Sequence, residues 1–335
     1  MATKTKKFKL FDTNRDGTGV YEEESRKPTL LFFFKLLWRK LSQLVRLNVL
    51  LFVQVIPVLV FLYVYFLGTK TPTATETLYA PLYGISKISG ASSITALLDM
   101  NAIQMGIPIF SPVIMTVLII LAVIFALTFG WINVGSSYVV RGLFRGDPVF
   151  VFSDFFYAIK RNLKQGFFLG LIDFVISGVL IIDFFYFYQK TGSFGFDFMY
   201  FAIFGLIILW FIMRFYIYNL LVTFDIKIFK LIKNALIFTV LGIGRNILAL
   251  LGIVILTVFH ILLIWIMIPM GISIPIILPF FYLLAATAYM ACYAAYPVID
   301  KYMIAPYATE TDDEEFVYLK EHTEEEENSD SSDNP

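Results

Sequence analysis

The sequence predicts an all-α membrane protein: a polytopic bundle of six transmembrane helices with two or three interfacial basic amphipathic helices. Three observations support this prediction. Hydrophobic residues make up 59% of the chain, more than is usual for a soluble domain. Six apolar stretches of roughly twenty residues are each long enough to cross the hydrocarbon core of a bilayer. The connections between these stretches alternate between basic and charge-poor.

The alternation of Lys and Arg predicts the topology. Residues 1–46 contain 11 of them, whereas the connection over 68–107 contains only Lys70 and Lys87. The third connection has five, the fourth only Lys190, the fifth four and the last none. Because positively charged connections stay on the cytoplasmic side, we expect a cell-membrane protein with both termini in the cytoplasm. The cations of the third and fifth connections are Arg141, Arg145, Lys160, Arg161, Lys164, Lys227, Lys230, Lys233 and Arg245.

Three segments are expected before the first long loop. Residues 1–28 are polar and form a flexible cytoplasmic tail. Residues 29–46 repeat large apolar side chains at helical spacing with cations between them, which predicts a helix lying along the membrane surface. The first span covers about 47–67, and Pro57 within it predicts a kink.

The membrane domain covers residues 29–306, and an acidic tail follows it. A second basic amphipathic segment covers about 150–165, where Ser153 or Asp154 is placed to cap the helix. A third basic segment covers about 225–245. Residues 307–335 are acidic and lack periodicity, so we expect a disordered cytoplasmic tail. The other five spans are expected at about 112–139, 166–188, 198–222, 247–268 and 274–298.

Basic side chains of the three amphipathic segments are candidate contacts for lipid. Cations at the edge of a span attract the anionic headgroups of the cytoplasmic leaflet. Their position beside spans makes anionic membrane lipids the expected partners, and nucleic acid is not expected. The interfacial basic residues are Arg39, Lys40, Lys160, Arg161, Lys164, Lys230 and Lys233.

The order of segments also indicates an internal repeat. The repeating unit is a basic amphipathic helix, a span going out and a span coming back. Residues 33–43 can be laid on 155–165 without gaps, and several identical residues coincide. A fainter third copy places 233–234 on 161–162. Parallel repeats of this kind are a known membrane architecture, but convergence of three helices under the same interfacial constraints would give a similar pattern.

Ionisable side chains within spans are candidates for function because the bilayer makes them costly. Asp173 and Arg214 lie at similar depth in consecutive spans, roughly 10–12 Å from the cytoplasmic end at 1.5 Å per residue. Gln54 and Asn133 fall at a similar level, so the four predict a polar layer inside the bundle. The layer could be a substrate or proton path, but the preferred interpretation is a clamp of hydrogen bonds between helices or an Arg214 side chain that extends to the interface. Asp183 lies near the outer end of its span, where water reaches it.

The remaining motifs favour neither a metal centre nor a cofactor. His260 is alone in its span, and Cys292 lies among small residues typical of a close helix–helix seam. No nucleotide-binding or hydrolase motif is present, so an enzyme is not expected. The N-terminal region matches the spacing of a calcium loop, but a flexible turn is the preferred interpretation because too few residues precede it for a helix. The residues of that pattern are Asp12, Asn14, Asp16, Gly17 and Glu23.

Several short motifs taken together are similar to a known family. They are Gly17, Gly19, Val20, Glu22 and Glu23; the run over 26–40; Leu47-Asn48; Ile56-Pro57; 141–147; and Phe155, Phe156, Ala158, Ile159, Lys160, Asn162 and Lys164. This combination resembles the YesL-like family of bacterial integral membrane proteins of unknown function over most of residues 17–300. The resemblance implies a cell-membrane protein associated with sugar uptake and supplies no catalytic residues.

Three functions remain open from the sequence. The first is a non-enzymatic accessory or scaffold protein, associated with carbohydrate uptake and contacting sugar-permease components. The alternative is a small-solute transporter that uses the polar layer around Asp173 and Arg214. The least favoured is an intramembrane enzyme, because no motif indicates a reaction.

Overall fold

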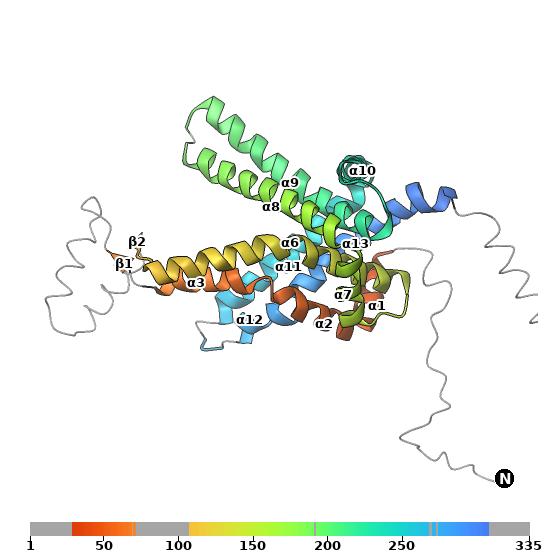
Figure 1. Ribbon diagram of the computed structural model, residues 1–335, viewed down its shortest axis with the longest axis horizontal. Coiled ribbons are helices and arrows are strands. Elements are labelled where there is room, and N and C mark those ends of the chain that lie inside the picture. The colour runs from red at the N-terminus through yellow and green to blue at the C-terminus, as the bar shows by residue number, and fades with distance from the viewer. Residues whose placement is uncertain are drawn as a thin grey trace, which may run out of the picture.

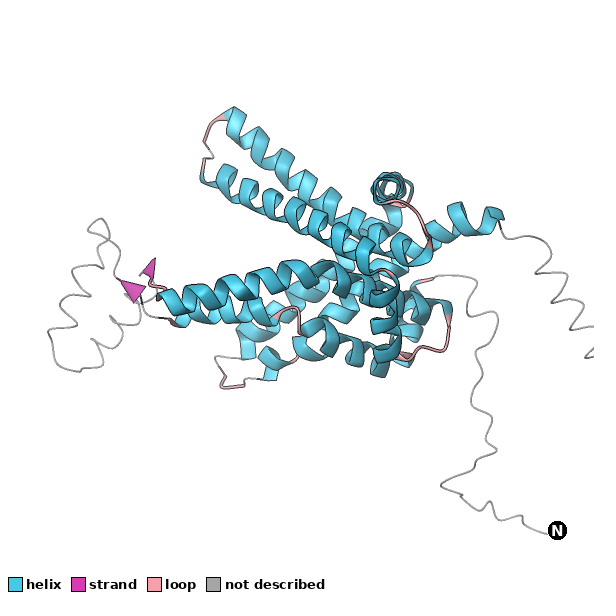
Figure 2. Ribbon diagram, in the orientation of Figure 1, coloured by secondary structure: helices cyan, strands magenta, loops and turns pink. Residues whose placement is uncertain are grey.

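The computed structural model describes residues 29–68, 70–71, 107–190, 192–267, 270–272 and 274–307. Within these ranges the elements are helices joined by turns and short loops, apart from one pair of two-residue strands (Figure 2). Strand β1 (Lys70–Thr71) pairs antiparallel with β2 (Ile107–Pro108), at the two ends of the first long loop. The all-α prediction therefore holds for the described chain. The predicted N-terminal tail, the calcium-like pattern and nearly all of the acidic tail lie outside the described residues.

Five helices are long and apolar enough to cross a membrane, and a bent pair would make a sixth span. Helix α6 shows why such a segment begins and ends where it does. The hydroxyl of Ser111 accepts a hydrogen bond from the N–H of Ile114 (3.3 Å), and Gly146 ends the helix with φ of 85°. The five are α6 (Pro112–Arg145), α8 (Leu163–Gln189), α9 (Phe194–Thr223), α11 (Ile243–Met267) and the segment Pro279–Tyr307.

The bent pair is the first predicted span, and its boundaries differ from the prediction. Helix α1 (Leu30–Arg39) ends ten residues into the predicted amphipathic segment. Helix α2 (Leu41–Phe52) joins the rest of that segment to the start of the predicted span, and α3 (Ile56–Leu67) follows at an angle of 58°. Pro57 lies in the first turn of α3, where its missing N–H is not needed, so the chain bends just before the proline.

The last predicted span is also interrupted. Helix α12 (Ile274–Ile277) is only one turn long, and α13 (Pro279–Ile299) begins after a break at Leu278. The helical path then continues past the predicted end as a π-helix, Asp300–Ile304, and a 3₁₀ turn, Ala305–Tyr307. Pro297 removes one N–H from the hydrogen-bond ladder just before this change of pitch.

The two further basic segments form α7 (Val151–Arg161) and α10 (Ile228–Leu241). The expected N-cap of α7 is wrong: Phe150 occupies that position, and neither Ser153 nor Asp154 caps the helix. The carboxylate of Asp154 instead accepts a hydrogen bond from the backbone N–H of Phe150 (2.8 Å). The backbone N–H of the N-cap residue Phe150 is thus paired with a side chain from the first turns of α7. An acidic side chain plays the same part in a capping box.

Burial supports three copies of the same unit. In each copy a short helix is followed, after a single non-helical residue, by a helix that enters the bundle; these residues are Lys40, Asn162 and Gly242. The third copy is therefore in a different register from the predicted one, since Gly242 rather than Asn234 matches Asn162. Counted from the break, the same four positions are buried in every copy: Leu36, Leu44, Leu47 and Leu51; Ala158, Gly166, Leu169 and Asp173; and Phe238, Asn246, Ala249 and Ile253.

The core lies toward the end of the molecule that bears α1, α7 and α10. The α8–α9 hairpin and the α3–α6 pair leave this core in different directions (Figure 1). Helices α6 and α8 are in close contact where Gly130 meets Gly166 and Gly170. Asn48 joins α2 to α13, since its amide donates to the carbonyl of Pro279 (2.9 Å) and accepts from the N–H of Ala285 (2.8 Å). The spans keep most of their apolar side chains on the outside, as lipid-facing helices do.

Candidate functional site

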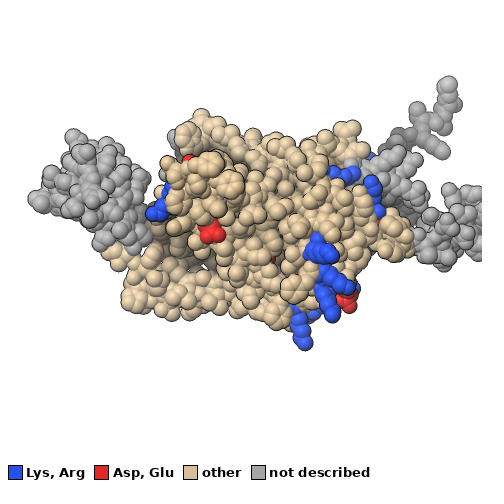
Figure 3. Space-filling view, turned by 90° about the horizontal axis from the view of Figure 1, so that it is seen from above, with Lys and Arg blue, Asp and Glu red and all other residues tan. Residues whose placement is uncertain are grey.

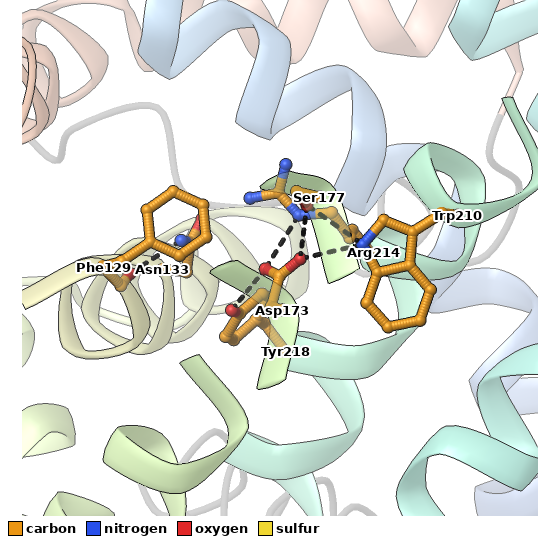
Figure 4. Close-up of polar contacts among 7 residues, drawn as sticks. All are labelled: Phe129, Asn133, Asp173, Ser177, Trp210, Arg214 and Tyr218. Atoms are coloured by element: carbon orange, nitrogen blue, oxygen red, sulfur yellow. Dashed lines mark hydrogen bonds and ion pairs between the residues drawn. The ribbon is translucent and has the colours of Figure 1, made fainter. Parts of the chain in front are cut away.

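A buried carboxylate organises the polar cluster between α8 and α9. Asp173 is 1% exposed and accepts four hydrogen bonds (Figure 4). Arg214 Nε lies 2.9 Å from Oδ2, which also accepts from the Tyr218 hydroxyl (2.6 Å). Oδ1 accepts from Trp210 Nε1 (3.0 Å) and from the Ser177 hydroxyl (3.3 Å). The charge of Asp173 is thus stabilised by one cation and by three neutral donors.

Helical spacing explains how these side chains meet. Trp210, Arg214 and Tyr218 are four residues apart on α9 and therefore share one face of the helix. Asp173 and Ser177 are likewise one turn apart on α8. The pairing of Asp173 with Arg214 follows the sequence-based hypothesis, whereas the other three donors were missed. The signal that would have found Trp210 and Tyr218 is their position one turn before and after Arg214.

Arg214 also borders a partly open cavity of about 390 Å³ between the helices. Its Cζ lies 5.2 Å from the centre of the Phe129 ring, and Nε faces Asp173. The two Nη atoms point away from Asp173 and Trp210 (Figure 4). The cavity lies among α2, α3, α6, α9, α11 and α13, and its lining is Leu51, Gln54, Val55, Val58, Phe125, Phe129, Ile132, Asn133, Ser136, Ser137, Phe211, Arg214, Phe215, Tyr218, Asn219, Ile253, Leu284, Thr287, Ala288, Ala291 and Cys292.

Gln54 and Asn133 line this cavity, together with Arg214, whereas Asp173 lies behind Arg214. Gln54 sits in the break between α2 and α3, where its amide donates to the carbonyl of Phe125 (2.8 Å) and accepts from the hydroxyl of Thr128 (2.8 Å). Asn133 donates to the carbonyl of Phe129 on its own helix (2.8 Å). The four residues of the predicted layer therefore share one region, but only Asp173 and Arg214 are bonded to each other.

Cys292 borders the same cavity and lies against Asn219, a residue that the sequence reasoning missed. The Cys292 Sγ is 3.5 Å from Oδ1 of Asn219, and the amide nitrogen of Asn219 donates to the carbonyl of Phe215 (2.6 Å). Ala294 and Ala295 near it are buried in helix packing, in line with the small-residue seam expected there. The Cys292 thiol is free and 2% exposed.

His260 is 3% exposed near the far end of α11. Its Nδ1 shares a hydrogen bond with the hydroxyl of Tyr282 on α13 (2.9 Å), while Nε2 has no partner among the described residues. Within that part of the chain no group of three His, Cys, Asp or Glu side chains could hold a metal ion. Asp183 is half-buried toward the far end of α8.

Most of the Lys and Arg side chains visible in Figure 3 lie toward the end of the molecule that bears α1, α7 and α10. Lys160, Arg161 and Lys164 line a second hollow of about 460 Å³, opposite residues 221–225 at the end of α9. Lys230 and Lys233 are exposed on α10.

Lys40 lies at the break after α1, next to Arg39, which ends that helix. Partial burial and the neighbouring charge of Arg39 lower the pKa of the Lys40 ammonium.

The hydropathy of the five long helices and the bent pair makes this a multi-pass membrane protein in its described part. Comparison with known proteins found no family model, no curated protein and no solved structure that matches the chain.

Proposed function

We propose that the chain is a small-solute transporter whose binding site is the cavity at Arg214. The observation that supports this most directly is that one cavity brings Arg214, Gln54 and Asn133 together between the helices. Its size falls within the range of about 300–1,000 Å³ that is usual for small-molecule sites. A charged side chain at this depth is costly, and such residues commonly mark solute paths.

The broken first span gives further support. Transporters commonly build their solute sites where a spanning helix is interrupted, since the free backbone groups and the bend allow the site to open to either side. Leu51, Gln54 and Val55 line the cavity at the break between α2 and α3. The bend of 58° therefore lies at the cavity wall rather than elsewhere in the span.

Uptake by purified protein in sealed proteoliposomes tests this function. We expect time-dependent accumulation of at least one solute from a panel of sugars, amino acids and organic acids, above that of protein-free vesicles. Arg214→Gln should abolish the accumulation, while Lys190→Gln, in the exposed turn after α8, should leave it unchanged. Equal accumulation by the Arg214→Gln protein at the same reconstituted amount would reject the cavity as the path.

A second candidate function is the accessory role. It is favoured by the exposed basic helices α7 and α10, which lie at one end of the bundle where a partner protein could contact them. The similarity to the YesL-like family makes sugar-permease components the proposed partners. Affinity capture from membranes should then recover permease subunits, and replacing Lys230 and Lys233 by Gln should reduce that recovery. Recovery unchanged by the substitutions would argue against this surface.

We also propose that anionic phospholipid occupies the hollow beside α7. Lys160, Arg161 and Lys164 are exposed, and no carboxylate forms an ion pair with them in the described chain. Three cations at the start of a span suit a headgroup phosphate. In nanodiscs of phosphatidylglycerol the protein should melt at a higher temperature than in phosphatidylcholine, and the triple Gln variant should lose most of the difference. A difference retained by the variant would place the lipid elsewhere.

A further inference from the structure

The chemistry of the cavity walls narrows the class of solute, on the assumption that the cavity is the binding site proposed above. Arg214 is the one charged side chain in the lining, and all lining residues belong to the described chain. Most of the rest is apolar and includes four phenylalanine rings, which can surround a hydrocarbon or aromatic group. The rings belong to Phe125, Phe129, Phe211 and Phe215.

The guanidinium of Arg214 is only partly used by the protein. Among described residues its single ion pair is through Nε to Asp173, and its side chain retains 25% exposure although Asp173 has 1%. The Nη edge, which carries four of the five N–H donors, points away from the carboxylate (Figure 4). Trp210, Tyr218 and Ser177 also stabilise the charge of Asp173, so this carboxylate does not depend on Arg214 alone.

We infer that the cavity binds a small amphipathic carboxylic acid. The carboxylate would accept two parallel hydrogen bonds from the Nη edge of Arg214, the arrangement in which arginine binds a planar carboxylate most strongly. The apolar body of the ligand would lie against Phe125, Phe211 and the other rings, where it gains the free energy of leaving water.

Other solute classes fit the walls less well. A sugar needs hydrogen-bond partners around its whole ring, but the amides of Gln54 and Asn133 already donate to backbone carbonyls, and the hydroxyl of Thr287 donates to the carbonyl of Leu284 (2.8 Å). The remaining hydroxyl groups of the lining near them are those of Ser136 and Ser137, which lie together on α6. An organic cation would be repelled by Arg214. A phosphate dianion would need a second cation, which the lining lacks.

Binding to the full-length protein in detergent tests the ligand class. Isothermal titration compares 4-phenylbutyrate with its amide and with 4-phenylbutylamine, which share the apolar body and differ at the head group; glucose is the fourth ligand, and empty micelles are the blank. We expect saturable binding of the acid, at least tenfold weaker binding of the amide and none of the amine or glucose. Acid and amide of equal affinity, no acid binding, or binding of glucose alone would overturn the inference.

Variants locate the binding. Arg214→Lys retains the charge but removes the planar fork, so we expect at least tenfold weaker binding of the acid. Arg245→Lys, on an exposed face of α11, is the matched control and should bind as the unaltered protein does. Acid binding unchanged in Arg214→Lys would overturn the inference; should that variant not fold, the acid and amide comparison on the unaltered protein decides. Acid binding without uptake into proteoliposomes would reject transport alone, whereas uptake of another solute without acid binding would reject only the ligand class.

Discussion

At the scale of the residue, two glycines allow α6 and α8 to touch. A Cβ added to Gly130 would lie 2.6 Å from the Cα of Gly170, and one added to Gly170 would collide with the backbone of Gly130. Because backbone atoms cannot yield as a flexible side chain does, even alanine must force the helices apart. Small residues at such seams let membrane helices approach closely.

We predict that Gly170→Ala destabilises the protein by roughly 1–3 kcal/mol, the usual cost of overpacking a tight contact. Gly178→Ala lies on the same helix where an added Cβ would meet no atom within 4 Å, so it should not lower stability. Melting temperatures in detergent, followed by size-exclusion chromatography after heating, measure both. Loss of stability in both variants alike would point to α8 itself rather than to its contact with α6.

The second prediction concerns Asp173. Asp173→Asn leaves the charge of Arg214 without its counterion inside the membrane, and we expect a loss of roughly 3–5 kcal/mol, typical of breaking a buried pair. Ser177→Ala removes one hydrogen bond of 3.3 Å and should cost about 1 kcal/mol or less. Unfolding in a mild denaturant compares the two, and an equal loss would contradict the ion pair as the main interaction.

A double variant separates the pair from its surroundings. Asp173→Asn combined with Arg214→Gln should cost less than the sum of the single changes, because the second change removes the unpaired charge. Reversing the two charges should not restore stability, since Trp210, Tyr218 and Ser177 all donate to the side chain at position 173. Strict additivity in the double variant would show that the two charges do not interact.

At the scale of the element, the end of α9 is held by a side chain from α6. Arg141 Nη1 donates to the carbonyl of Val222 (2.8 Å) and to the hydroxyl of Thr223 (3.0 Å). The last carbonyls of a helix lack partners within it, and a cation there is favoured by the helix dipole. Arg141 therefore caps the C-terminal end of α9 and joins this end to α6.

The prediction for this element is local opening. Arg141→Met should raise hydrogen exchange in residues 220–224 while the middle of α9 stays protected, because only the last turn loses its partner. Arg145→Met is the control, as Arg145 is half-exposed and forms only a longer contact with Asp147 (3.6 Å). Exchange that rises equally in both variants would mean that Arg141 does not fasten the helix end.

At the scale of the whole molecule, the topology can be tested at one position just before α9 and one on α10, which follows it. The basic segment that contains Lys230 is predicted to be cytoplasmic and Ser193 to be outside. An impermeant thiol reagent should therefore label Ser193→Cys in intact cells and Lys230→Cys only in opened cells. Because Cys292 lines the proposed solute cavity, both cysteines are introduced into a Cys292→Ala protein, so that the introduced thiol is the one that reacts. Labelling of Lys230→Cys in intact cells would show that this segment lies outside the cell, contrary to the predicted topology.

The sequence by itself determined that the chain is helical and where its long apolar segments lie. Hydropathy and helical spacing are local properties, so α6, α8, α9 and α11 follow the expected spans to within a few residues. That Asp173 and Arg214 can meet was also predictable, because the position of a residue along a helix depends only on the count of residues from its end.

Only the tertiary structure decided what each polar side chain meets and how the copies align. Trp210 and Tyr218 bond to Asp173 because α8 and α9 pack with one face of each toward the other, and that rotation is not written in the hydropathy of either helix. The register of the third copy follows from the break at Gly242, whereas the matched Lys and Asn letters had suggested another. Residue letters on a lipid-facing surface vary freely among apolar types, but burial against neighbouring helices constrains the same positions in every copy.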